Sequence, residues 1–202
     1  MKIIVSGISN ALNDFYDETQ KLFTNQDDTV LYEAYNFDKQ YYDSDIVFLV
    51  FDGMPLNFFE NQNIYSTGIV IPIFIDSSKF YVGGILKQSY QQGEVCSTCM
   101  LGRMKEIIGV SPMYDCIFSQ TNFNMVIVRK LTICNFMRSL LSYIINSDKK
   151  LCQNLLVYSF DTNTFFTNYQ IGYTKCPNCD FNDYNQSTKL FFTKWRPYDK
   201  FF

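Results

Sequence analysis

Two short cysteine pairs are the residues of this sequence best suited to chemistry. The first pair is Cys96 with Cys99 and the second is Cys176 with Cys179, each with two residues between the cysteines. That spacing lets a tight turn direct both sulfur atoms at one ion, and four thiolates together form the usual closed tetrahedral site of structural zinc. We therefore predict one zinc ion on these four cysteines, joining two parts of the chain that are far apart in sequence. Two unrelated surface turns, a redox dithiol and disulfide bonds are the alternatives that the spacing leaves open.

The residues that the chain lacks restrict its chemistry further. It contains no histidine, which excludes histidine bases, histidine metal ligands and Ser-His-Asp triads. Segment 4–10 contains a single glycine, Gly7, where a dinucleotide-binding fingerprint has three. Those glycines let phosphates approach the backbone at a helix N-terminus, so the sequence predicts no phosphate-binding loop here. A zinc ion held by four sulfur atoms has no open position for water, and we expect it to act on stability alone.

Length and composition favour one domain in a reducing cytoplasm. The 202 residues, 47% of them hydrophobic, are sufficient for a single core. We expect no secretory signal and no membrane span, because no apolar run approaches the roughly 20 residues that a bilayer requires. In the cytoplasm, paired cysteines are more often metal ligands than disulfides. The net charge of −3 gives no electrostatic reason to expect nucleic acid as a partner.

Hydrophobic patterning predicts an α/β fold that positions the cysteine pairs. Run 46–51 is continuously apolar, which is typical of a central parallel strand covered on both faces, and it leads into Asp52. Gly7 is expected to begin a turn, and Pro72, which lacks a backbone donor, predicts a sheet edge or a bulge. The expected strands are 2–6, 29–35, 46–51, 69–76, 80–86 (antiparallel to its neighbour) and a hairpin of 155–160 with 165–172. The expected helices are 10–23, 55–65, 100–108 and 129–146.

The order of these elements resembles the ThiF/MoeB proteins of the ubiquitin-activating-enzyme-like superfamily. A buried strand leading into Asp52 is followed by a helix, two strands, a cysteine pair, a long helix, a hairpin and a Cys-Pro-x-Cys pair. The resemblance covers about residues 46–179. It implies a Rossmann-like mixed sheet flanked by helices, with a tetracysteine zinc site on the two pairs. It also places Asp52 where the family has its metal-binding acidic residue.

The resemblance implies a domain organisation as well. Residues 1–202 would form a single ThiF-like domain, in which 1–45 are a degenerate nucleotide-binding half. Residues 46–180 are the best-matching part, and 181–202 form a tail rich in aromatic side chains.

Departures from the family point to one of its branches. Active members hold ATP with a glycine-rich loop and with arginine and lysine residues, whereas segment 7–45 contains no arginine. The lysines of that segment, Lys21 and Lys39, match no such pattern. Some members carry a thioester-forming cysteine beyond the first pair, and Cys116 is the cysteine near that place, although a small buried hydrophobe is the simpler interpretation of it. A ThiF-like fold with zinc and without the ATP loop is similar to the partner proteins of YcaO cyclodehydratases, which make thiopeptides and microcin- or streptolysin-type products.

That branch implies a scaffold with no catalytic and no cofactor-binding residue. Its members bind the leader of a precursor peptide, often as an added strand, and deliver the core peptide to a YcaO enzyme that cyclises Cys, Ser or Thr side chains with ATP. The implied cofactor is structural zinc, and the implied partners are the precursor peptide, the YcaO enzyme, an azoline dehydrogenase and a second copy of the chain. Longer members carry a winged-helix module that clamps the leader, and we expect no separate module of this kind ahead of the ThiF-like part.

Two other classes of function remain as alternatives. The first is an ATP-dependent adenylating enzyme that acts on a peptide or protein C-terminus, with Asp52 on magnesium and Cys116 as acceptor. The second is an unrelated zinc-bearing structural module, in which the aromatic tail would contribute an interaction surface.

Overall fold

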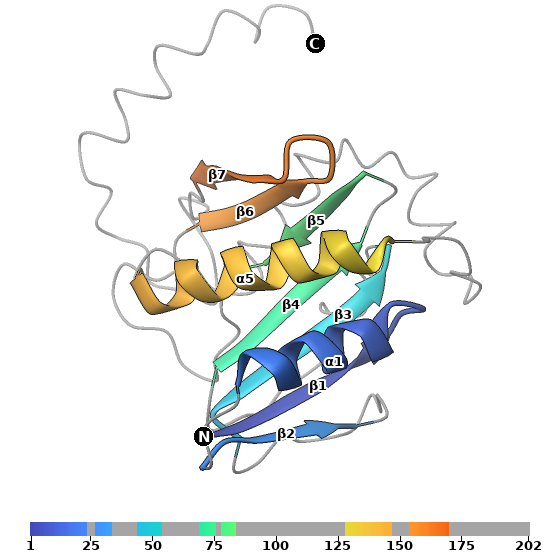
Figure 1. Ribbon diagram of the computed structural model, residues 1–202. Helices are drawn as coiled ribbons and strands as arrows, with labels where there is room; N and C mark the ends of the chain where they lie inside the picture. The colour runs from blue at the N-terminus through green and yellow to red at the C-terminus, as the bar shows by residue number, and fades with distance from the viewer. Residues whose placement is uncertain are drawn as a thin grey trace, which may run out of the picture.

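The computed structural model describes residues 1–23, 27–33, 44–53, 69–75, 78–83, 128–146 and 154–169. Within these ranges the chain forms a seven-stranded mixed sheet and two helices (Figure 1). The strands are β1 (Lys2–Ile8), β2 (Thr29–Tyr32), β3 (Ile46–Asp52), β4 (Ile69–Ile75), β5 (Lys79–Val82), β6 (Asn154–Ser159) and β7 (Thr164–Tyr169). The helices are α1 (Leu12–Leu22) and α5 (Lys130–Asn146).

The sheet has the strand order β2-β1-β3-β4-β5-β6-β7. Strands β2, β1, β3 and β4 are parallel, and β4 to β7 pair with one another in antiparallel fashion. All seven residues of β3 are buried, because β3 lies inside the parallel part and both of its faces are covered. The expected α/β class, the central parallel strand and the antiparallel hairpin are therefore confirmed in the described part of the chain.

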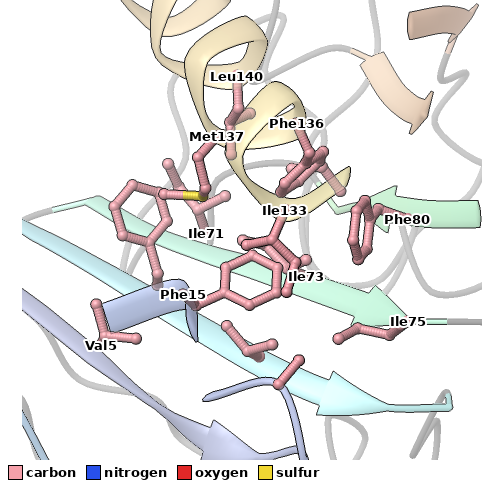
Figure 2. Close-up of a cluster of buried hydrophobic side chains, with 14 of the residues drawn as sticks. Val5, Phe15, Ile71, Ile73, Ile75, Phe80, Ile133, Phe136, Met137 and Leu140 are labelled. Carbon is pink, nitrogen blue, oxygen red and sulfur yellow. The ribbon is translucent and has the colours of Figure 1, made fainter. Parts of the chain in front are cut away.

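Both helices lie on the same face of the sheet (Figure 1), and their buried side chains join those of the strands in one cluster. The spacing of Ile133, Phe136, Met137 and Leu140 places four fully buried side chains on one side of α5. Figure 2 shows these side chains directed at the sheet, with Phe15 of α1 beside them. The core is thus built from periodic apolar residues that the sequence already contains.

Phe136 is the aromatic centre of this cluster. Its ring lies 4.3 Å from that of Phe80, 5.4 Å from that of Tyr158 and 5.9 Å from that of Phe15. These rings come from α5, β5, β6 and α1, so one side chain joins four elements. Replacing a buried phenylalanine with alanine typically costs about 3–5 kcal/mol, and Phe136 has the surroundings for such a cost.

The opposite face of the sheet is buried as well. Phe51 and Phe74 stack there with ring centroids 6.0 Å apart, and neither is more than 2% exposed. Other residues that alternate with the helix-facing side chains, such as Val47 of β3 and Leu155 of β6, are also buried. This two-sided burial accounts for the continuous apolar runs of β3 and β4, where a one-sided sheet would show alternation.

The expectation that Pro72 marks an edge or a bulge is wrong. Strand β4 lies between β3 and β5, and its residues pair one to one with β3, Leu49 standing opposite Pro72. The carbonyl of Pro72 accepts a 2.9 Å hydrogen bond from Gly83, just beyond the last residue of β5. Since the N–H and C=O of one residue point to the same side of a strand, the missing donor falls at the end of the β4–β5 ladder. Proline is tolerated there because the ladder with β3 does not use its nitrogen.

Several predicted elements lie outside the described residues. These are the helices expected at 55–65 and 100–108, both cysteine pairs and the aromatic tail. Neither of the two described helices is long and apolar enough to cross a membrane.

Candidate functional site

The carboxyl ends of β1 and β3 form the candidate site. From β1 the chain first passes to β2 on one side and then to β3 on the other, so the direction of strand addition reverses between β1 and β3. In open α/β sheets, ligands bind at such a reversal, beyond the carboxyl ends of the two strands. The residues found there are Ser9 and Asn10 after β1, and Asp52 and Gly53 at the end of β3.

Asp52 is buried and hydrogen-bonded to the loop that follows β1. The residue is only 4% exposed. One carboxylate oxygen accepts a 2.6 Å hydrogen bond from the Ser9 hydroxyl, and the other accepts a 2.9 Å bond from the Asn10 backbone N–H. The Ser9 oxygen in turn accepts a 3.0 Å hydrogen bond from the Ala11 backbone N–H. Both oxygens of Asp52, the last residue of β3, therefore bind the β1–α1 loop.

Gly7 also has a structural role at this site. The expectation that Gly7 begins a turn is wrong, because the residue lies within β1. Its φ of +145° is one that side chains disfavour, and a Cβ atom built on it would lie 1.8 Å from the Val50 carbonyl oxygen. Glycine is therefore needed because β1 and β3 approach closely, and this is a different reason from access of a phosphate to the backbone.

Ser9 and Asn10 are the site residues that the sequence analysis missed. A serine between an apolar strand and a helix is a common capping signal, but nothing in the local sequence connects it to an aspartate 43 residues away. Lys21, which matched no nucleotide-binding pattern, donates a 2.6 Å hydrogen bond to the buried Glu18 carboxylate. Lys39 lies outside the described residues.

Charged groups join α1 to α5 on the same side of the sheet. The Lys130 ammonium lies 3.1 Å from a carboxylate oxygen of Asp14 and 3.1 Å from one of Asp17, and these hydrogen bonds raise the pKa of Lys130. The hydrogen bond from Lys21 lowers the pKa of Glu18, although burial of the carboxylate opposes it. Burial raises the pKa of the Cys134 thiol, and its hydrogen bond to Glu18 adds to the effect. Cys134 is therefore a protonated packing residue at neutral pH.

The cysteines of the predicted zinc site, Cys96, Cys99, Cys176 and Cys179, lie outside the described residues, and so does Cys116. The described strands nevertheless show where the chain leaves toward each pair. Strands β5 and β7 both run antiparallel to β6, so they run in the same direction and finish at the same end of the sheet.

The segments that follow this common exit are long enough to join the two pairs. Cys96 follows Val82, the last residue of β5, by 14 positions, and Cys176 follows Tyr169, the last residue of β7, by seven. An extended chain covers up to about 3.5 Å per residue, so both segments are long enough to meet. The four-thiolate site stays a prediction that is compatible with this topology.

Comparisons with known proteins identify the fold. No protein-family model and no curated protein matches this sequence. A chain of the E. coli microcin synthetase McbBCD complex is similar in structure over 87% of this chain and 67% of its own length, with a TM-score of 0.54 and 11% identity. The heterocyclase TruD is similar over 89% of this chain with a TM-score of 0.52 and 7% identity. This chain covers only 27% of the TruD chain. The mixed α/β fold is therefore one that also occurs in a microcin synthetase and in a heterocyclase.

Proposed function

We propose that this chain is a non-catalytic, zinc-stabilised scaffold that binds a ribosomal precursor peptide and presents it to a YcaO-type cyclodehydratase. The product would be an azoline- or thiazole-containing peptide antibiotic. We further propose that residues 1–202 form a single ThiF-like domain that works in the cytoplasm, as a homodimer or in a complex with the cyclodehydratase and an azoline dehydrogenase. The observation that carries the proposal is the fold that the chain shares with one chain of microcin synthetase.

The geometry at the carboxyl ends of β1 and β3 supports the non-catalytic part of the proposal. Both oxygens of Asp52 are engaged by groups of the β1–α1 loop. The loop is therefore held against β3 by the side chain that the ThiF/MoeB resemblance would assign to a metal ion. Nucleotide binding at this place would require those hydrogen bonds to be exchanged for contacts with the ligand, at a cost of about 1–3 kcal/mol for each buried group left without a partner.

The shared exit of β5 and β7 supports the zinc part of the proposal. A metal that joins the two segments beyond these strands would close the antiparallel half of the sheet. Binding energy of this kind contributes directly to folding, so zinc would stabilise the half of the fold that carries the pairs.

Reconstitution of azoline formation tests the proposal. The purified chain is combined with a YcaO-type enzyme and a precursor peptide rich in Cys, Ser and Thr, with ATP and magnesium, and the peptide is followed by mass spectrometry. We expect loss of one water per ring only when the chain is present. Equal ring formation without the chain, or no binding of the chain to either precursor or enzyme in pull-down, would refute the scaffold function.

The position of Asp52 keeps one alternative open to experiment. A carboxylate at the reversal point of a parallel sheet is also what an adenylating enzyme would use to bind magnesium. In that case, incubation with ATP, magnesium and a peptide substrate would give pyrophosphate exchange, and ATP would raise the melting temperature. We expect neither, and the variant Cys116→Ser, which removes the proposed acceptor, should leave scaffold activity unchanged.

A further inference from the structure

Asp52 is a buried carboxylate that no cation neutralises in the part of the chain that the structure describes. The ion pairs of the described residues engage other carboxylates, namely Asp14, Asp17, Glu18 and Asp28. The partners of Asp52 are instead two hydrogen-bond donors of the β1–α1 loop, the Ser9 hydroxyl and the Asn10 N–H. The negative charge at the end of β3 is therefore stabilised by this loop.

The two hydrogen bonds have the lengths expected of bonds to a charged acceptor. Burial of a carboxylate is costly unless donors replace the water molecules that it loses. The bond from the Ser9 hydroxyl is 2.6 Å long and that from the Asn10 N–H is 2.9 Å long. Hydrogen bonds to an ionised acceptor are this short and about twice as strong as bonds between neutral groups. The loop thus offers a buried anion one well-placed donor for each oxygen.

The donors of the loop are fixed by hydrogen bonds within the loop itself. The Ser9 hydroxyl oxygen accepts from the Ala11 N–H at 3.0 Å, so its single proton is directed at Asp52. The Ser9 carbonyl accepts from the Leu12 N–H at 3.3 Å, which holds the backbone of the same residue. The loop therefore orients its donors locally, whereas the anion that they bind comes from another strand.

We propose that Asp52 is a built-in anion: its carboxylate occupies an oxyanion-binding position of the β1–α1 loop and excludes external carboxylate and phosphate groups from it. Because Asp52 is part of the same chain, its effective concentration at the loop exceeds that of a dissolved anion. This inference rests on the proposed function and deepens its non-catalytic part, since it names the residue that keeps this position closed. Removal of the carboxylate alone should leave the position open to a small oxyanion.

Chemical rescue of the full-length variant Asp52→Ala tests the proposal. The variant lacks a carboxylate at this position, and formate is the same group as a free ion. In urea denaturation, we expect about 0.2 M sodium formate to raise the folding equilibrium constant of the variant about fivefold over sodium chloride of equal ionic strength, the effect of an anion at about four times its Kd that binds the folded state alone. Inorganic phosphate should act in the same direction. The parent protein, in which the position is filled, should respond to both anions as it does to chloride, apart from the general effect of each salt on stability.

Two further variants serve as matched controls. Ser9→Ala weakens the same loop but leaves Asp52 in place, so formate should stabilise it no more than the parent protein. Asp52→Asn keeps the shape of the side chain and an oxygen acceptor but lacks the charge. Its unfolding equilibrium constant should be about tenfold above that of the parent protein, because both hydrogen bonds lose their ionised acceptor. Formate should not rescue it, since the amide fills the position.

Several results would overturn the proposal. One is a formate effect on Asp52→Ala no larger than that on the parent protein, and another is equal stability of Asp52→Asn and the parent protein. A rescue by formate without any by phosphate would overturn the exclusion of phosphate groups. If Asp52→Ala does not fold in any of these salts, the stability of Asp52→Asn decides the question.

These measurements are independent of the reconstitution of azoline formation, because they follow stability alone. Failure of the rescue would remove Asp52 as a built-in anion and leave the scaffold function standing. If the parent chain supports no azoline formation, the scaffold function fails whatever formate does to Asp52→Ala.

Discussion

The hydroxyl of Ser9 lies 2.6 Å from a carboxylate oxygen of Asp52, which joins the start of the α1 region to the end of β3 across 43 residues of sequence. The second oxygen of Asp52 accepts from the backbone N–H of Asn10, so one side chain holds two consecutive residues of the loop. In a nucleotide-binding fold, the loop at this place would hold phosphate. Here the side chain of Asp52 holds the loop instead, so the residues at the reversal point of the sheet have a structural role.

Replacing Asp52 should be costly for this reason. Asp52→Ala leaves the Ser9 hydroxyl and the Asn10 N–H without their acceptor, and we expect a loss of about 3 kcal/mol in the free energy of unfolding. Ser9→Ala removes one donor to Asp52 and also the acceptor of the Ala11 N–H, and it should cost about 1–2 kcal/mol. Urea denaturation measures both, and the double variant should cost less than the sum because the two residues interact directly. As a control, Asp161→Ala in the exposed β6–β7 turn should stay within about 0.5 kcal/mol of the parent protein.

Gly7 should tolerate no side chain. A methyl group there would meet the Val50 carbonyl oxygen at 1.8 Å, and moving that oxygen would disturb the β1–β3 ladder. We expect Gly7→Ala to destabilise the protein by about 3 kcal/mol or more, or to prevent soluble expression. Gly53→Ala provides the comparison, since its φ of +77° brings the cost of a left-handed backbone, about 1–2 kcal/mol. Equal urea midpoints for Gly7→Ala and the parent protein would contradict the assigned role.

Glu18 should make stability depend on pH in the acid range. Its contact with Lys21 lowers its pKa in the folded protein below the ordinary value of 4.5. A group with a lowered folded pKa contributes stability that is present above the unfolded value and is lost as pH falls through the folded value. The advantage of the parent protein over Glu18→Gln should therefore be full at pH 7 and shrink below about pH 4.5. Urea titrations at several pH values test this, and an advantage that grows on acidification would show that the sign is wrong.

Zinc should stabilise the fold without taking part in chemistry. We expect elemental analysis of the reduced protein to find one zinc ion per chain, and Cys179→Ser to lose it. The melting temperature of that variant should fall by about 5 °C or more, and a chelator should lower that of the parent protein in the same way. Cys116→Ser, outside the predicted ligand set, should keep both metal and stability. A Cys179→Ser protein with full metal content and an unchanged melting temperature would show that the ligand assignment is wrong.

Sequence patterns alone predicted the helices and most of the strands in the part of the chain that the structure describes. The continuous apolar run of β3 predicted burial on both faces, and the 3.6-residue spacing of apolar residues predicted a helix over 129–146, which the structure shows as α5 (Lys130–Asn146). Both patterns depend on neighbours a few positions away, which is why they can be read without coordinates. The apolar run likewise predicted the position of β3, the strand that ends at Asp52.

The tertiary structure decided how these elements meet. A proline is tolerated at position 72 of an interior strand because its missing donor faces the end of β5. A glycine is required at position 7 of β1 because Val50 of β3 comes so close. Likewise, Asp52 lies at the end of β3, whereas its hydrogen-bond partners belong to the loop that follows β1. Strand order and register are set by contacts between segments that are distant in the chain, and the free energy of such contacts depends on the whole packed sheet, whereas periodicity records only which face of each element is buried.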